Sequence, residues 1–290
     1  MEREKNSDQI PSIYTVSVLG AEEILKKIQL FPKKEKLLLK NDGFFEKEKK
    51  HDTLTERMEF FTPERDLENT VKELESLFIS EQQEKSIRTE ENIQILIDER
   101  QQELGDKKGS VNNLFLEIHK NPYRIPFEIQ LFPYSRDDIY PREKTRKSLS
   151  NQENFTYYTF PPEEYLVLAF YEILNGLELL NDLSWYKEVY EILNREPLEG
   201  RKVWEGLRHL LSEHPIPSVE KRMETIESYK NYGYMKKRWK SQSRRCRGHY
   251  PQWEQVITLL SAFFRPIFEG VLKDEIFLGD WMPQLSRYLD

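Results

Sequence analysis

Short apolar stretches with strand-like spacing recur through the first half of the chain. Residues 12–19 are rich in β-branched and aromatic side chains and stop at Gly20, which predicts a strand, a glycine turn and a helix over 21–28. Alternating apolar and polar positions predict further strands at 55–61, 93–97, 114–118 and 127–132. These elements together indicate an α/β or α+β sheet domain.

One long helix interrupts the predicted strands. Thr62 offers an N-cap and Pro63 a first helical position, and the residues after them have helical apolar spacing. The expected apolar face consists of Leu67, Val71, Leu74 and Phe78. The lysine-rich stretch 33–50, broken by Asn41-Asp42-Gly43, predicts an exposed loop or hairpin.

The second half of the chain has helical periodicity. After an expected polar linker at 135–154, apolar stripes and Pro-rich breaks predict helices at 161–180, 185–193, 203–211, 219–229 and 252–268. The fold class is therefore predicted as α+β, with a mixed-sheet domain at 1–135 and a helical domain at 136–290.

Composition narrows the class of protein. The chain has 290 residues, 38% of them hydrophobic, and a net charge of -7. We expect a cytoplasmic protein without a membrane partner, because the sequence has no run of eighteen apolar residues and no secretory signal. Cys246 is the only cysteine, which excludes an internal disulfide and a multi-cysteine metal site. Its position among arginines would favour the thiolate, but a passive surface thiol is the simpler interpretation.

A basic segment stands out in this acidic chain. Seven basic residues lie within residues 236–247, with a tryptophan among them. The candidate nucleic-acid-binding residues are Lys236, Lys237, Arg238, Trp239, Lys240, Arg244, Arg245 and Arg247. Like charges this close repel one another, so either a nucleic-acid phosphate backbone or the chain's own acidic segment at 63–108 would relieve the repulsion. In the first case Trp239 would serve as a stacking platform for a base.

Two glutamates are the most interesting acidic residues of the sheet domain. Glu59 and Glu128 each lie between apolar neighbours on a predicted strand. If the two strands are adjacent, both carboxylates reach the same face and together could bind a divalent cation. A solvated sheet face explains the same pattern.

Three passages of the helical half resemble the nucleotidyltransferases of the AbiEii/AbiGii toxin family, which belong to the DNA polymerase β-like superfamily. Pro161-Pro162-Glu163-Glu164-Tyr165-Leu166 is similar to a helix start of that family, and Asn181-Asp182-Leu183-Ser184-Trp185-Tyr186 to one of its turns. The third passage resembles the end of the family's C-terminal region, and it runs from Arg238-Trp239 through Tyr250-Pro251 to Phe263-Phe264-Arg265-Pro266. The family's turn, however, carries arginine where this chain has Asn181 and aspartate where it has Trp185.

The resemblance implies a nucleotidyltransferase core in the first half. Leu19-Gly20-Ala21 would then stand for the family's phosphate-binding glycine element, and Thr55-Glu56-Arg57-Met58-Glu59-Phe60 for its T-x-D-x-D-F strand. Glu128 would supply the third acidic position. This assignment makes Glu59 and Glu128 the catalytic Mg2+ ligands, while Gly20, Ala21, Thr55 and Arg57 would line a nucleoside triphosphate.

The motif departs from the family at one decisive position. Arg57 stands where the first metal-binding aspartate is expected, and a positive charge there opposes two-metal catalysis. The resemblance therefore implies either a toxin-type enzyme acting on RNA such as a tRNA end, with a cognate antitoxin, or a pseudoenzyme that binds nucleic acid or protein. In the pseudoenzyme Arg57 would bind a triphosphate directly. A structural protein whose acidic and basic segments pair internally is the third hypothesis.

Overall fold

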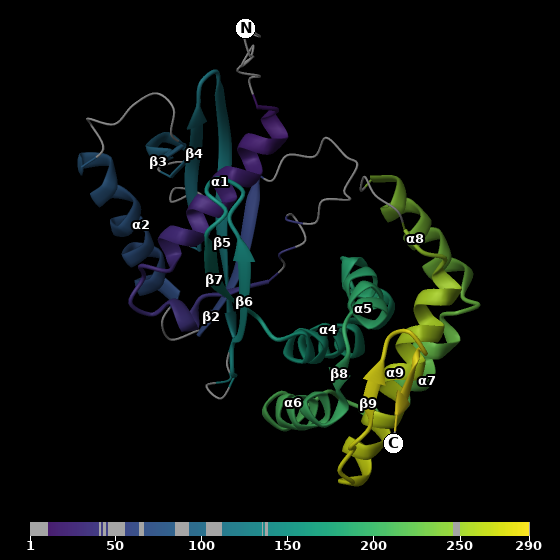
Figure 1. The fold of residues 1–290 in the computed structure, drawn as a ribbon. Helices are drawn as coiled ribbons and strands as arrows, with labels where there is room; N and C mark the ends of the chain where they lie inside the picture. The colour runs from purple at the N-terminus through teal and green to yellow at the C-terminus, as the bar shows by residue number, and fades with distance from the viewer. Residues whose placement is uncertain are drawn as a thin grey trace, which may run out of the picture. The chain divides into compact units, whose positions relative to one another are not determined.

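The chain folds into two compact units, residues 1–160 and residues 161–290. The computed structural model describes residues 11–40, 42, 45, 56–63, 67–84, 93–102, 112–134, 136, 139–245 and 250–289. The first unit contains a seven-stranded mixed sheet, and the second consists mostly of helices (Figure 1). The α+β class predicted from the sequence is confirmed.

The first element is a helix, so the strand and glycine turn predicted for residues 12–20 are wrong. Helix α1 spans Ile13–Ile28 without interruption, and the Ser12 side chain caps it by accepting a hydrogen bond from the Thr15 backbone N–H. The β-branched residues favoured a strand prediction, although the buried positions form one apolar face of a helix. Its buried members recur at spacings of three and four residues, for example Val18, Ala21, Leu25 and Ile28.

The sheet places the two predicted acidic strands side by side. Its strand order is β3-β4-β5-β2-β1-β7-β6, in which β5 runs parallel to β2 and antiparallel to β4. The strands predicted at 55–61, 93–97, 114–118 and 127–132 are confirmed, although their bounds shift. The first unit contains β1 (Leu38–Leu39), β2 (Arg57–Pro63), β3 (Gln94–Ile97), β4 (Asn113–Lys120), β5 (Tyr123–Tyr134), β6 (Arg142–Lys147) and β7 (Asn154–Thr159).

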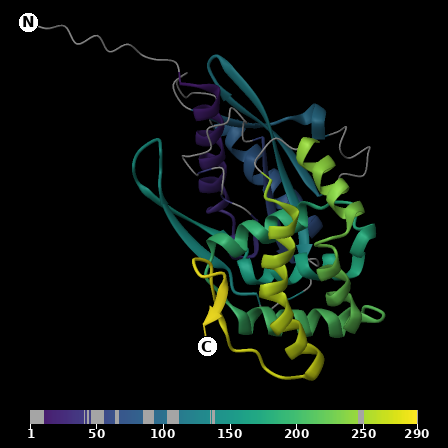
Figure 2. The ribbon, with the colours of Figure 1, turned by 90° about the vertical axis from the view of Figure 1, so that its right-hand side faces the viewer.

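Both long helices of the first unit lie on the same face of this sheet (Figures 1 and 2). Helix α2 (Leu67–Glu84) buries Val71, Leu74 and Phe78, as its apolar spacing predicts. It begins later than predicted, because Thr62 and Pro63 belong to β2. The helix-covered face of the sheet carries a continuous apolar core, which leaves the polar positions of β2, β4 and β5 on the opposite face.

Two segments predicted as exposed or linking belong to the sheet. Leu37, Leu38 and Leu39 are buried, and the last two form β1 between β2 and β7, so residues 33–50 are not wholly an exposed loop. The expected polar linker at 135–154 instead contains β6 and the start of β7, which form a hairpin (Figure 2). The compact units accordingly divide between Phe160 and Pro161.

The second unit is a helical bundle with a small sheet. Most of its helices match the predicted ones, and its core includes Phe170 and Phe264, whose rings stack with centroids 3.8 Å apart. The helices are α4 (Pro162–Gly176), α5 (Ser184–Arg195), α6 (Gly200–Glu213), α7 (Arg222–Ser228), α8 (Gly233–Arg245) and α9 (Trp253–Lys273). Short 3-10 turns are η1 (Lys34–Lys36) in the first unit, and η4 (Leu177–Leu179) and η5 (Val219–Lys221) in the second.

A three-stranded sheet closes the second unit and was not predicted. Its order is β10-β9-β8, from β8 (Leu198–Glu199), β9 (Asp280–Met282) and β10 (Arg287–Leu289). The strands are too short to show alternation. Trp281 anchors them, because its side chain is fully buried and its indole N–H donates to the Leu193 carbonyl at 2.8 Å.

Helix α9 is the one described helix whose length and apolar character would suit a membrane span. It runs through the middle of the second unit in Figure 2 and packs against α5, α6 and α7. Its buried side chains include Trp253, Phe263 and Phe268. The packing is that of a core helix, which accounts for its hydrophobicity.

Gly20 offers a test of the α1 packing. A Cβ atom added at Gly20 would lie 2.4 Å from Cδ1 and 2.6 Å from Cγ2 of the fully buried Ile118, so Gly20→Ala should lower the free energy of unfolding by about 1–3 kcal/mol. The loss should shrink in an Ile118→Val background. Gly233→Ala is the control, since nothing lies within 4 Å of its added Cβ. Chemical denaturation that ranks both variants as equally stable would contradict this packing.

Candidate functional sites on the sheet and on helix α8

Glu59 and Glu128 lie on the same face of the sheet, opposite the helices. In the parallel pairing of β2 with β5, Arg57 is the direct partner of Glu128, and Glu59 is the partner of Gln130. The two glutamates are therefore diagonal neighbours. The register puts an arginine beside Glu128, where a shared metal would require a second carboxylate.

Arg57 and Glu128 form an ion pair within a short hydrogen-bond network. The Arg57 Nε and Nη2 atoms each lie 2.7 Å from Oε2 of Glu128. The other carboxylate oxygen, Oε1, accepts a hydrogen bond from Asn113 Nδ2 at 2.7 Å. Glu128 is mostly buried, with 17% of its side chain exposed, so losing the arginine would leave its charge poorly compensated.

Glu59 has its own cation. Lys40, which directly follows β1, places its Nζ 2.9 Å from Oε2 of Glu59, and its backbone N–H donates to the Glu59 carbonyl at 2.8 Å. The Lys40 ammonium also lies over the ring of Phe132, 5.6 Å from the centroid. Each glutamate that the sequence suggested as a metal ligand is thus matched by a positively charged side chain.

This donor set does not fit a pair of magnesium ions. Two-metal sites need several carboxylates that converge, whereas here Arg57 and Lys40 occupy the places next to Glu128 and Glu59. Across the part of the chain that the structure describes, no three Asp, Glu, His or Cys side chains form a group able to hold a metal ion.

The residues expected to line a triphosphate are not brought to this face. Gly20 and Ala21 are buried in the middle of α1, where the helix uses its backbone N–H groups internally, so no glycine turn presents them to a phosphate. Thr55 lies outside the described residues. Arg57 is half exposed on the sheet face, with its guanidinium on Glu128.

The basic segment forms helix α8, and its tryptophan is part of the core. Trp239 is 5% exposed, and its indole N–H donates to the Pro251 carbonyl at 2.9 Å. Its ring packs against Tyr250 and Trp253, with centroids 5.0 and 5.2 Å away. A ring enclosed in this way offers no face to a base, so the stacking role expected for Trp239 does not fit.

Two cations of the segment have structural partners. Arg238 donates to the carbonyls of Glu178, Leu180 and Asn181, which satisfies backbone acceptors around the end of η4. Lys236 pairs with Glu254 at 2.5 Å, and this hydrogen bond lowers the pKa of the Glu254 carboxyl. Sequence periodicity alone could not separate these two from the remaining cations.

Four cations remain on the exposed face of α8, which we call the basic face. They recur at intervals of three, four and one residues along one side of the helix, with the exposed Ser241 between them. Within the described residues none of them makes an ion pair. The basic face consists of Lys237, Lys240, Arg244 and Arg245. Cys246 and Arg247 lie outside the described residues.

Some polar residues of these sites were missed in the sequence. Asn113 directly precedes the strand predicted at 114–118, and Lys40 follows the run Leu37-Leu38-Leu39, which was assigned to a loop or hairpin. An apolar triplet followed by lysine is a usable strand signal, but only the observed register shows that Lys40 reaches Glu59.

Comparison with known proteins gives distant structural similarity only. No protein-family model matches the chain, and no curated protein matches it in sequence. Among solved structures, JHP933 from Helicobacter pylori aligns with a TM-score of 0.40 and 8% identity, covering 92% of this chain and 96% of its own. An H. pylori protein described provisionally as a nucleotidyltransferase aligns with a TM-score of 0.38 and 10% identity, covering 92% and 100%. At these scores function has to be inferred from the side chains of this chain.

Proposed function

We propose that this chain is a nucleotidyltransferase-like protein that binds RNA through the basic face of α8 and does not carry out magnesium-dependent nucleotidyl transfer. The basic face carries the proposal, because four exposed cations lie on one helix in a chain of net charge -7. The RNA target, such as a tRNA end, is part of the proposal and follows from the resemblance to toxin-type nucleotidyltransferases.

The geometry of the basic face suits a polynucleotide backbone. From Lys237 to Arg245 it extends over about 12 Å of helix, at 1.5 Å per residue. Cations along such a line can each contact a phosphate, and the release of counterions from the nucleic acid then drives binding. Since Trp239 is buried, we expect contacts to the backbone rather than stacking on bases, and therefore little sequence preference.

The ion pairs on the sheet face argue against transfer. A magnesium ion between Glu59 and Glu128 would have to displace or approach both Lys40 and Arg57, whose positive charges repel it. Without two carboxylates facing each other there is no bridge between a triphosphate and an attacking hydroxyl. The pseudoenzyme hypothesis therefore fits the side chains better than the enzyme hypothesis does.

A transfer assay tests this part of the proposal. Wild-type protein incubated with Mg2+, each of the four labelled nucleoside triphosphates and total tRNA should label no RNA. RNA binding is measured in the same samples, so that an inactive preparation is recognised. Labelling that disappears in a Glu59→Gln variant would contradict the proposal and restore Glu59 as a metal ligand.

A further inference from the structure

A second basic site lies at the turn between β4 and β5 in the first unit, whereas α8 belongs to the second unit. A pocket of about 310 Å³ is lined there by seven residues. They include His119, Lys120 and Arg124, together with the side-chain amides of Gln94 and Asn121, and none of the seven is acidic. In a chain of net charge -7, a pocket lined by hydrogen-bond donors and cations favours an anionic ligand.

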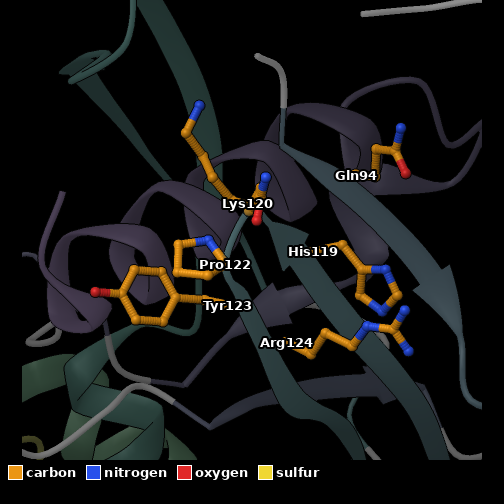
Figure 3. A pocket seen from close by; sticks show the side chains of 7 residues that line it. Gln94, His119, Lys120, Pro122, Tyr123 and Arg124 are labelled. Carbon is orange, nitrogen blue, oxygen red and sulfur yellow. The ribbon is translucent and has the colours of Figure 1, made fainter. Parts of the chain in front are cut away.

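The sheet register aligns three of these residues in one row. His119 on β4 is the direct cross-strand partner of Gln94 on β3 and of Arg124 on β5. Direct partners place their Cβ atoms about 5 Å apart on the same face. Figure 3 shows the His119 ring and the Arg124 guanidinium extending in the same direction from their strands. The row offers an amide, an imidazole and a guanidinium to one small ligand.

The His119 ring is held in a fixed orientation. Its Nε2 atom lies 2.7 Å from Oε2 of Glu117, two residues earlier on the same face of β4. That contact leaves Nδ1 as the ring nitrogen available to a ligand. Glu117 makes this hydrogen bond from beside the pocket and is not one of its seven lining residues.

Arg124 provides the geometry that selects the ligand. It is exposed near the tip of the hairpin, and its guanidinium carries donors in a planar fork that matches two oxygens of a phosphate. Lys120 lines the same pocket but has other interactions, so the inference rests on the row of Gln94, His119 and Arg124.

We infer that this row, the hairpin site, binds a terminal phosphate group, either free or as a monoester. Inorganic phosphate and the phosphate of a mononucleotide share this chemistry, and the pocket volume accommodates the phosphate group with a small substituent. The inference does not depend on RNA binding by α8, because none of its residues lies on that helix.

Phosphate titrations of the full chain test the inference. Inorganic phosphate and adenosine monophosphate should each shift the NMR signals of the His119 ring saturably, while adenosine should not. Arg124→Gln should weaken phosphate binding about tenfold, the effect of losing one charge-assisted hydrogen-bonding group. Arg124→Lys keeps the positive charge but loses the planar guanidinium. Its phosphate affinity should lie between those of the wild type and Arg124→Gln. Arg201→Gln, an exposed arginine on α6, is the matched control.

Comparing the titrations with inorganic phosphate and with adenosine monophosphate shows which of the two the site prefers. Equal affinities for phosphate and adenosine monophosphate would define the phosphate group as the whole ligand, whereas tighter binding of the nucleotide would extend the site to its nucleoside. A His119→Gln variant identifies the ring signal and, with its melting temperature checked, provides a second loss of affinity. Unchanged phosphate affinity in both Arg124→Gln and His119→Gln, or no binding by the wild type, would overturn the inference. RNA affinity measured on the same variants shows whether the hairpin site and the basic face fail separately.

Discussion

Replacing Lys237, Lys240, Arg244 and Arg245 together by glutamine should weaken RNA binding about a hundredfold. The four side chains are exposed and without ion pairs in the described part of the chain, so the change removes phosphate contacts while leaving the core intact. At about 0.7 kcal/mol for each exposed charge contact, the four sum to about 2.8 kcal/mol, or two orders of magnitude in Kd. Fluorescence anisotropy with a labelled single-stranded RNA measures this directly.

A second quadruple variant controls for net charge. Arg201, Lys202, Arg208 and Lys273 are also exposed cations of the helical unit, two lysines and two arginines, and replacing them by glutamine changes the net charge equally. They lie on α6 and at the end of α9. The control should retain RNA affinity to within a few-fold. An equal loss in both variants would mean that overall charge, and not the basic face, attracts RNA.

Trp239→Ala should lower the free energy of unfolding by about 3–5 kcal/mol. Losses of this size are typical when a large buried side chain is replaced by alanine. The substitution removes ring contacts with Tyr250 and Trp253 and the hydrogen bond to the Pro251 carbonyl. It would loosen α8 from α9 and from the segment between them. Thermal or urea unfolding of the full chain gives the measurement.

Trp239→Phe distinguishes a core residue from a base-stacking residue. Phenylalanine keeps a buried aromatic ring but loses the indole N–H donor and part of the ring volume, so it should cost less stability than alanine. Below its melting temperature the variant should bind RNA as the wild type does. A stable Trp239→Phe protein with strongly reduced RNA affinity would show that the ring contacts RNA.

Periodicity predicted most of the long elements that have one buried face, with the first half of helix α1 as the exception. Helix α2 and strands β2 and β5 follow directly from apolar spacing, as do most helices of the second unit. The first half of helix α1 was mistaken for a strand because Ile13, Val16 and Val18 favour strands locally, whereas burial against the sheet favours the helix; the helix predicted over 21–28 is confirmed. Strand β1 was missed because it has only two residues and takes its stability from its neighbours β2 and β7.

The candidate site was predicted in part. That Glu59 and Glu128 share one face followed from alternation and holds in the structure, since β2 and β5 are adjacent. Their partners did not follow, because pairing Glu128 with Arg57 depends on register, and pairing Glu59 with Lys40 depends on a strand that was not predicted. On α8, charge counting found the basic segment but could not separate the buried Trp239 and the carbonyl-bound Arg238 from the exposed cations.

The salt dependence of RNA affinity tests the central claim most directly. For single-stranded RNA, the slope of log K against log salt is about -0.7 for each phosphate neutralised. If the basic face holds the RNA backbone, the glutamine variant of its four cations should have a slope shallower than that of the wild type by about 2 to 3, whereas the α6 and α9 control variant should keep the wild-type slope. A slope that stays the same when the basic face is removed would contradict the account.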